Sequence, residues 1–335
     1  MQRRTDPPEL IPLFDAVVAS PDDDAPRQVL ADALAERGDE RGEFIALQLL
    51  AAKGQATAAQ RSREQALLDG SWARWLAEVP GLGKTPTHVE GGAVHFRRGF
   101  PESAVFSPTG VGRDSPVWRT VRRLDLAGPG LPSAAELASP HLESLEALTG
   151  LDAAALQVVL QGPPRPRLRE LGFAGPHMLG DRARREQTQV LALTRFPSLK
   201  TLSLAPSPFR HHADWLDWLF ASELARQLGR LRLWMELPFD VSGLHAKLIR
   251  HGLDALTLEV ATMGVRTVLD ARWLTVQFDS DFWFGRHAAS LRNMGSWFAP
   301  FPYREFEVKV GGRAATPEEL ERLGETFTRH VRSVA

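Results

Sequence analysis

Leu228-Gly229-Arg230-Leu231-Arg232-Leu233 is one of eight segments with the pattern apolar-x-x-apolar-x-apolar. The eight segments cover residues 121–126, 142–147, 168–173, 199–204, 228–233, 253–258, 271–276 and 303–308. Their alternating ends predict short strands with one buried face. The segments recur about every 26 residues, which predicts one repeated structural unit. The last two are weaker members, because one spacing is too short for a helix and the other is long.

The period resembles that of leucine-rich repeats, which is roughly 20–29 residues. The resemblance implies a solenoid with a parallel sheet on its concave face and helices or turns on its convex face. We therefore predict an α/β fold: an irregular leucine-rich-repeat-like solenoid with an N-terminal helical domain and a C-terminal capping helix. A generic α/β sheet is the alternative.

The chain lacks the side chains that usually tie neighbouring repeats together. Leucine-rich repeats end their units with Asn or Cys, but this chain has Asn293 as its one asparagine and contains no cysteine. Buried backbone groups must therefore find other partners. This predicts uneven curvature and variable loops.

The N-terminal region predicts a series of helices. Asp22 or Asp23 can cap a helix that contains Pro26 in its first turn, and Gly38 supplies the left-handed residue after that helix. Asp39 can then cap the next helix. The acidic triplet 22–24 is accordingly interpreted as a helix start rather than as a metal site.

Three motifs in this region carry a family resemblance: PDDDAPR at 21–27, ADALAERGD at 31–39 and RGEFI at 41–45. They resemble the small bacterial repeat-companion domain of myxobacterial and planctomycete proteins, which is often found next to leucine-rich repeats. HFRRGFPE at 95–102 resembles the link that commonly follows it. Ala33 stands where the family usually has Trp. The resemblance implies a bacterial protein and a repeat context, and it brings no catalytic residue.

These signals divide the chain into four parts. We predict a helical repeat-companion domain at 1–80, a linker with the first capping strands at 81–120, the solenoid at 121–312 and a C-terminal capping helix at 313–335. The last part begins at Thr316, which is followed by Pro317 and has Glu319 three residues later, as in a capping box. Leu320, Leu323, Phe327 and Val331 form its apolar stripe.

Composition excludes several classes of chemistry. The 335 residues contain 40 Lys and Arg against 41 Asp and Glu, so a net charge of −1 gives no general attraction to nucleic acid or to an anionic membrane. The absence of cysteine excludes disulfides, thiolate catalysis, and cysteine-bound zinc or iron–sulfur clusters. No long apolar run or secretory signal is found, so we expect a cytoplasmic protein that does not enter the membrane.

Three short motifs suggest chemistry but favour structural roles. GLGKT at 81–85 fails as a phosphate loop, because Glu78 occupies the first glycine position and Pro86 interrupts the helix. The histidine pair 211–212 precedes Asp214 and Asp217 without a metal-ligand spacing, which favours a loop and a helix cap. Aromatic residues gather over 273–303, where packing is the first interpretation and a partner surface the second. We expect no cofactor and no metal.

The polar strand positions are the best candidates for a site, because in a horseshoe they project from the concave face. The candidate residues for partner binding are Arg123, Asp125, Glu146, Glu170, Arg230, Arg232, Trp234, Thr257, Glu259 and Gln277. Arg230, Arg232 and Trp234 share a face of one strand and could bind a carboxylate-bearing or aromatic partner. Solvation of a polar face is the alternative.

The sequence therefore predicts a non-enzymatic interaction or scaffold protein that binds another protein on its concave face. One alternative is a hydrolase-type enzyme with carboxylates and histidine in the repeat loops. A third hypothesis is nucleic-acid binding through Arg182, Arg184 and Arg185.

Overall fold

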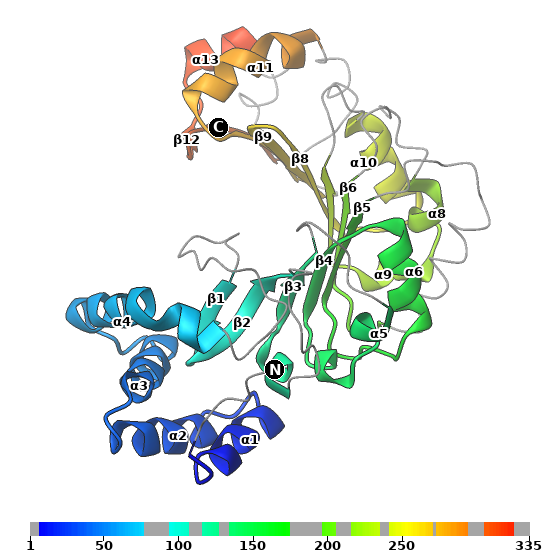
Figure 1. The fold of residues 1–335 in the computed structure, drawn as a ribbon. Helices are drawn as coiled ribbons and strands as arrows, with labels where there is room; N and C mark the ends of the chain where they lie inside the picture. Colours follow the sequence, from blue (N-terminus) through cyan, green and yellow to red (C-terminus); the bar gives the residue numbers. More distant parts are fainter. Residues whose placement is uncertain are drawn as a thin grey trace. The chain divides into compact units, whose positions relative to one another are not determined.

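The computed structural model describes residues 7–76, 94–106, 116–126, 134–174, 196–205, 216–234, 241–270, 273–293 and 305–324. The chain forms two compact units, Met1–Leu168 (unit 1) and Arg169–Ala335 (unit 2). Both units combine helices with β-strands (Figure 1). Within the described residues no helix has the length and apolar character needed to cross a membrane.

Unit 1 begins with four helices: α1 (Ile11–Ala19), α2 (Ala25–Ala35), α3 (Glu40–Ala52) and α4 (Ala58–Leu76). The predicted signals between α2 and α3 are confirmed. Gly38 has a φ of 73°, and the Asp39 side chain accepts a hydrogen bond from the Arg41 backbone N–H at 3.0 Å. The helices enclose a core that includes Phe14, Leu30 and Ile45.

The acidic triplet 22–24 forms a helix start held by arginines. The Asp23 carboxylate accepts a hydrogen bond from the Ala25 backbone N–H at 2.9 Å. Asp22 pairs with Arg122 and, at 2.7 Å, with Arg167. These contacts account for two of the three carboxylates. Among the described residues no group of three or more Asp, Glu or His side chains could hold a metal ion.

The strands of unit 1 are β1 (Val94–Arg97), β2 (Phe100–Val105), β3 (Arg123–Asp125) and β4 (Ala147–Leu151). β1 and β2 form an antiparallel hairpin, and β2, β3 and β4 pair in parallel. Shorter helical elements accompany them: η1 (Pro116–Thr120), α5 (Ala134–Leu137), η2 (Pro140–Leu142) and α6 (Ala153–Gln161).

Unit 2 contains the other strands. β5 (Glu170–Ala174), β6 (Thr201–Ala205), β7 (Arg230–Trp234) and β8 (Thr257–Thr262) pair in parallel. β9 (Val265–Leu269) lies antiparallel between β8 and β10 (Trp273–Phe278). β11 (Glu305–Val310) is parallel to β10, and the short β12 (Arg313–Ala314) is antiparallel to β11.

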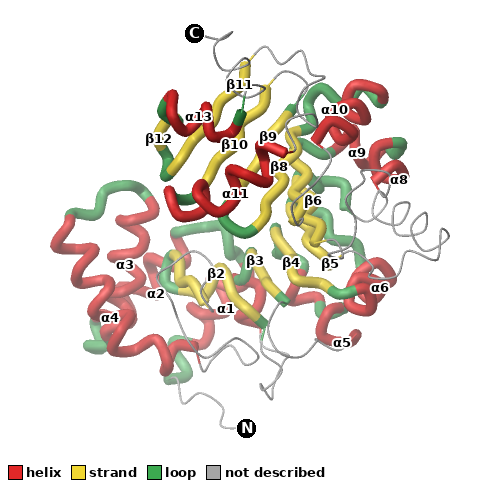
Figure 2. The backbone as a smooth tube through the Cα atoms, turned by 90° about the horizontal axis from the view of Figure 1, so that it is seen from above, coloured by secondary structure: helices red, strands yellow, loops and turns green. Residues whose placement is uncertain are grey.

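The described helices of unit 2 are α8 (Asp217–Phe220), α9 (Glu223–Gln227), α10 (Val241–Arg250), α11 (Asp281–Asn293) and α13 (Pro317–Leu323). Figure 1 shows α8, α9 and α10 on one side of the parallel strands. α11 packs on the sheet through Phe284, whose ring lies 5.0 Å from that of Phe278 on β10. Figure 2 shows α13 beside α11.

The parallel sheet predicted for residues 121–312 is wrong at β8–β9–β10, which pair antiparallel. The pairs β1–β2 and β11–β12, each with at least one strand outside that range, are antiparallel as well. The β8–β9–β10 arrangement has a clear physical cause. A parallel connection needs a dozen or more residues, and the interval after β8 is too short for a strand-to-strand crossover through a helix. Met263 and Gly264, the latter with a φ of 75°, instead turn the chain back into β9.

The register also corrects the predicted phase of two segments. Leu124 on β3 pairs with Leu148 on β4, and Leu231 on β7 pairs with Leu258 on β8. The sequence pattern instead aligned Leu145 with Leu124, and Leu256 with Leu231. Both leucines are buried just before their strands, so the apolar pattern continues through the turn and its phase is ambiguous without the pairing.

Side chains other than asparagine donate hydrogen bonds to backbone carbonyl oxygens in both units. In unit 1 the Arg165 guanidinium donates to the carbonyl oxygens of Leu142, at 2.8 Å, and Leu137. Burial lowers the pKa of Arg165 to about 10. In unit 2 the Gln227 amide donates to the Phe196 carbonyl at 2.9 Å. The expectation that buried backbone groups find other partners is therefore confirmed at these positions.

The predicted C-terminal helix start is confirmed. The Thr316 side chain accepts from the Glu319 backbone N–H, and the Glu319 carboxylate accepts from the Thr316 backbone N–H at 2.7 Å. Leu320 and Leu323 are buried. The expected continuation of the apolar stripe, Phe327 and Val331, lies outside the described residues.

Candidate functional site

The sheet of unit 2 has one apolar and one polar face, because its strands alternate. Leu171, Leu202 and Leu231 are buried on the apolar face. The residues between them point to the opposite face, and the strand register aligns them in rows. One row contains Glu170, Thr201, Arg230 and Thr257, and the next contains Gly172, Ser203, Arg232 and Glu259.

A chain of ion pairs crosses this polar face from β5 to β9. Arg232 contacts Glu170 at 2.8 Å and Glu259 at 3.3 Å. Glu259 also contacts Arg266 on β9 at 3.4 Å. We name these four residues, Glu170, Arg232, Glu259 and Arg266, the charged belt. The carboxylates of Glu170 and Glu259 are largely buried, whereas Arg266 is exposed. Because both glutamates are buried and paired with arginine, their side chains are held in place.

Two tryptophans and one arginine project from the same face beside the charged belt. Trp234 is 57% exposed at the end of β7, and Arg230 is exposed at its beginning. Trp273 is 45% exposed at the beginning of β10, where its indole N–H donates to the Thr275 hydroxyl at 2.6 Å. Exposed tryptophans on a regular strand offer large apolar area at a low cost in side-chain entropy.

The structure brings together six of the ten residues predicted for the site. Arg230, Arg232, Trp234, Thr257 and Glu259 lie with Glu170 on the polar side of β5, β7 and β8. Gln277 faces the same way, two positions beyond Thr275 on β10.

The other three predicted residues lie in unit 1. Arg123 and Asp125 occupy alternate positions of β3, opposite in direction to the buried Leu124. The assignment of Glu146 to a strand face is wrong. β4 begins at Ala147, which pairs with Arg123, so Glu146 precedes the strand and is half-buried. The error arises because the pattern placed the strand at 142–147, whereas β4 begins at Ala147.

Arg266 and Trp273 were missed as site residues. Arg266 belongs to β9, which the repeat pattern did not contain. The alternation of Val265, Thr267 and Leu269 after Gly264 is a signal that would have indicated a hairpin strand. Trp273 is part of the aromatic region at 273–303, for which packing was the first interpretation. The pairing of β10 with β9 shows that its side chain lies on the polar face.

A second exposed apolar patch surrounds the β8–β9 turn. Met263 is 62% exposed and Phe282 is 66% exposed. The Trp283 ring covers Gly264 and stacks on His287 with ring centroids 5.6 Å apart. A side chain at position 264 would collide with this indole ring, so the glycine is required for the turn to lie against α11.

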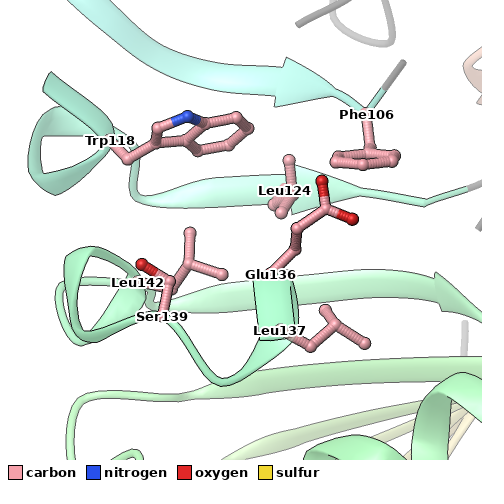
Figure 3. A pocket seen from close by; sticks show the side chains of 7 residues that line it. All are labelled: Phe106, Trp118, Leu124, Glu136, Leu137, Ser139 and Leu142. Carbon is pink, nitrogen blue, oxygen red and sulfur yellow. The ribbon is translucent and has the colours of Figure 1, made fainter. Parts of the chain in front are cut away.

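A small cavity lies in unit 1 (Figure 3). It has a volume of about 20 Å³, which is enough for about one water molecule. Its lining is mostly apolar and consists of Phe106, Trp118, Leu124, Glu136, Leu137, Ser139 and Leu142.

The carboxyl groups with perturbed pKa values have structural partners. Hydrogen bonds from Arg37 and Arg63 lower the pKa values of Glu9 and Glu43. Burial alone would raise the pKa of Asp22, but Arg167 and Arg122 lower it overall. Among the described residues these carboxyl groups lie in surface ion pairs.

Several sequence motifs cannot be placed. The GLGKT segment at 81–85, the histidines at 211–212 and the arginines at 182, 184 and 185 lie outside the described residues. Trp297, Phe298 and Phe301 of the aromatic region also lie outside them.

Comparison with known proteins gives no match. No family model matches the chain, and no curated protein or solved structure is significantly similar to it.

Proposed function

We propose that this chain is a cytoplasmic, non-enzymatic interaction protein that binds another protein on the polar face of unit 2. In this proposal, a repeat-companion domain precedes an irregular leucine-rich-repeat-like solenoid, and the solenoid is the binding scaffold. The support for a scaffold is the parallel pairing of β2–β4 and of β5–β8, with the apolar side chains on one face.

One observation carries the proposal. Arg230, Arg232 and Trp234 occupy alternate positions of β7 and point to the same face, with Trp234 more than half exposed. Tryptophan and arginine are the residue types most enriched among binding hot spots. The strand holds their spacing rigid, and the charged belt fixes Arg232. A partner therefore meets a surface whose order is established before binding.

Affinity capture from a native lysate tests the proposal. The full-length chain is immobilised as wild type and as the triple variant Arg230→Ala, Arg232→Ala, Trp234→Ala. The wild type is expected to retain a stoichiometric protein that the triple variant loses. The double variant Arg230→Ala, Trp234→Ala is measured beside it and should lose the partner at an unchanged melting temperature, because it keeps the charged belt. The triple variant should melt lower, because Arg232→Ala leaves the largely buried Glu170 and Glu259 without their shared cation.

The matched control is Ile249→Ala on α10, because Ile249 is also 54% exposed but lies on a helix. This variant should capture the partner as the wild type does. Equal capture by the triple variant would reject the polar face as the binding surface.

A further inference from the structure

The charges on the polar face of unit 2 are almost all neutralised by one another. The charged belt contains two arginines and two glutamates, each paired with a partner on another strand. On β11, Lys309 pairs with Glu307 at 2.9 Å. A partner that approaches this face therefore meets paired charges along most of its length.

Arg230 is the exception. Its side chain is exposed and forms neither an ion pair nor a hydrogen bond with another described residue. Its neighbours in the row are Thr201 and Thr257, which are short and uncharged. Within the part of the chain that the structure describes, the guanidinium is therefore a cation without an ion-pair partner on a face whose other described cations are paired. Planar guanidinium groups of this kind bind carboxylates in a bidentate manner.

The apolar contacts lie at a fixed distance from this cation. Trp234 is four residues further along β7, which corresponds to about 13 Å at the strand rise of about 3.3 Å per residue. It pairs with Ala261 on β8, a small residue that leaves the indole ring accessible. Trp273 lies three strands away on the same face. The face thus combines one cationic and two aromatic contact points.

From this arrangement we propose that the partner of this face is an acidic protein segment. An Asp or Glu side chain of the segment binds Arg230, and an apolar or proline residue about 13 Å away contacts Trp234. The inference rests on the proposed function. Nucleic acid is a poorer fit, because a phosphate backbone requires several free cations, and the arginines and lysine of this face other than Arg230 are already paired among the described residues.

Peptide selection tests the chemistry of the segment directly. Random twelve-residue peptides displayed on phage are selected on the immobilised full-length wild-type chain. Each recovered peptide is then measured by fluorescence anisotropy against wild type, Trp234→Ala, Arg230→Ala and Arg230→Lys. Arg226→Ala is the matched control, because Arg226 is an exposed arginine of unit 2 on α9.

The recovered peptides are expected to be enriched in Asp and Glu over the starting library. Arg230→Ala should weaken their binding about tenfold, which corresponds to the loss of one charged contact. Arg230→Lys should restore part of it, and Arg226→Ala should leave it unchanged. Binding should also weaken as salt rises from 50 to about 300 mM, because the contact is exposed.

Two different failures can be distinguished. Peptides that need Trp234 but are neutral or basic and indifferent to Arg230 would overturn the acidic segment while leaving the proposed binding face intact. Peptides that bind equally to all variants, or no recovered binders, would overturn both. Retention of single-stranded poly(U) RNA that is lost in Arg230→Ala would show that nucleic acid, not an acidic segment, is the ligand.

Discussion

Single residues decide how closely the N-terminal helices approach each other. A Cβ atom at Gly42 would lie 2.5 Å from the Ala31 carbonyl oxygen and 2.6 Å from the Ala35 nitrogen, both on the α2 backbone. Gly42 therefore lets α2 and α3 touch through their backbones. The neighbouring Arg41 is buried and lies over the rings of Phe14 and Phe100 at 5.1 and 5.0 Å. The RGEF motif thus has a packing explanation.

Gly42→Ala is expected to lower the free energy of unfolding by about 2–3 kcal/mol, because the methyl group must push two helices apart. Gly70→Ala is the matched control. A Cβ at that helical position would meet nothing within 4 Å, so alanine should raise stability by about 0.5–1 kcal/mol. Urea unfolding measures both. Equal effects of the two substitutions would contradict the close helix crossing.

Single elements are joined by side chains that bind backbone carbonyls. The Arg165 guanidinium donates hydrogen bonds to the carbonyl oxygens of Leu137 in α5 and Leu142 in η2. An arginine reaches further than an asparagine and can span a less regular connection. Its burial is costly, and the two carbonyls offset that cost only while both bonds are present.

Arg165→Met should therefore lower the free energy of unfolding by about 1–3 kcal/mol, since the Leu137 carbonyl loses the guanidinium, while the Leu142 carbonyl keeps the Leu145 backbone N–H. Chemical denaturation measures the change. Arg169→Met is the control, because Arg169 is exposed and should change stability by less than about 0.5 kcal/mol. An unchanged midpoint for Arg165→Met would show that water replaces the guanidinium.

The start of α13 provides a prediction for pH. Hydrogen bonds from Arg313 lower the pKa of Glu319 to about 2; burial opposes the shift and the Thr316 backbone N–H adds to it. The folded pKa lies below the ordinary value of 4.5, so the stabilisation is complete above pH 4.5 and is lost as pH falls towards 2.

Comparison of Glu319→Gln with the wild type tests this assignment. The stability difference between the two should be present at pH 6 and should shrink at pH 3, as measured by urea unfolding. Glu321→Gln, a nearby exposed position without a contact to Arg313 among the described residues, should show no such pH-dependent difference. A difference for Glu319→Gln that is as large at pH 3 as at pH 6 would contradict the charge-based explanation.

For the whole molecule, charge balance limits the choice of partner. The net charge of −1 provides no long-range field that would attract a polyanion. The arginines of the polar face are mostly paired within the protein, which removes them from phosphate binding.

The full chain is accordingly expected not to retain duplex DNA or poly(U) RNA at about 150 mM salt, as checked by electrophoretic mobility shift. Retention that falls steeply with salt would instead support the hypothesis based on Arg182, Arg184 and Arg185.

The sequence by itself determined the local features, because these depend on neighbours along the chain. The left-handed Gly38, the Asp39 cap, the Thr316 capping box and the alternation of Leu231 with Arg232 and Leu233 all follow from short patterns. The mixed α/β class and most strand positions follow from the same alternation.

Only the tertiary structure decided which segments pair and in which direction. Strand pairing depends on residues far apart in the sequence. Where an apolar pattern continues through a turn, the sequence does not show which leucine belongs to the strand: the pattern selected Leu145, but Leu148 is the residue that pairs with β3. Three features arise only when distant strands are in register: the insertion of β9, the ion pair between Glu170 and Arg232, and the position of Arg230 between Thr201 and Thr257. The candidate site depends on these pairings, which no single segment encodes.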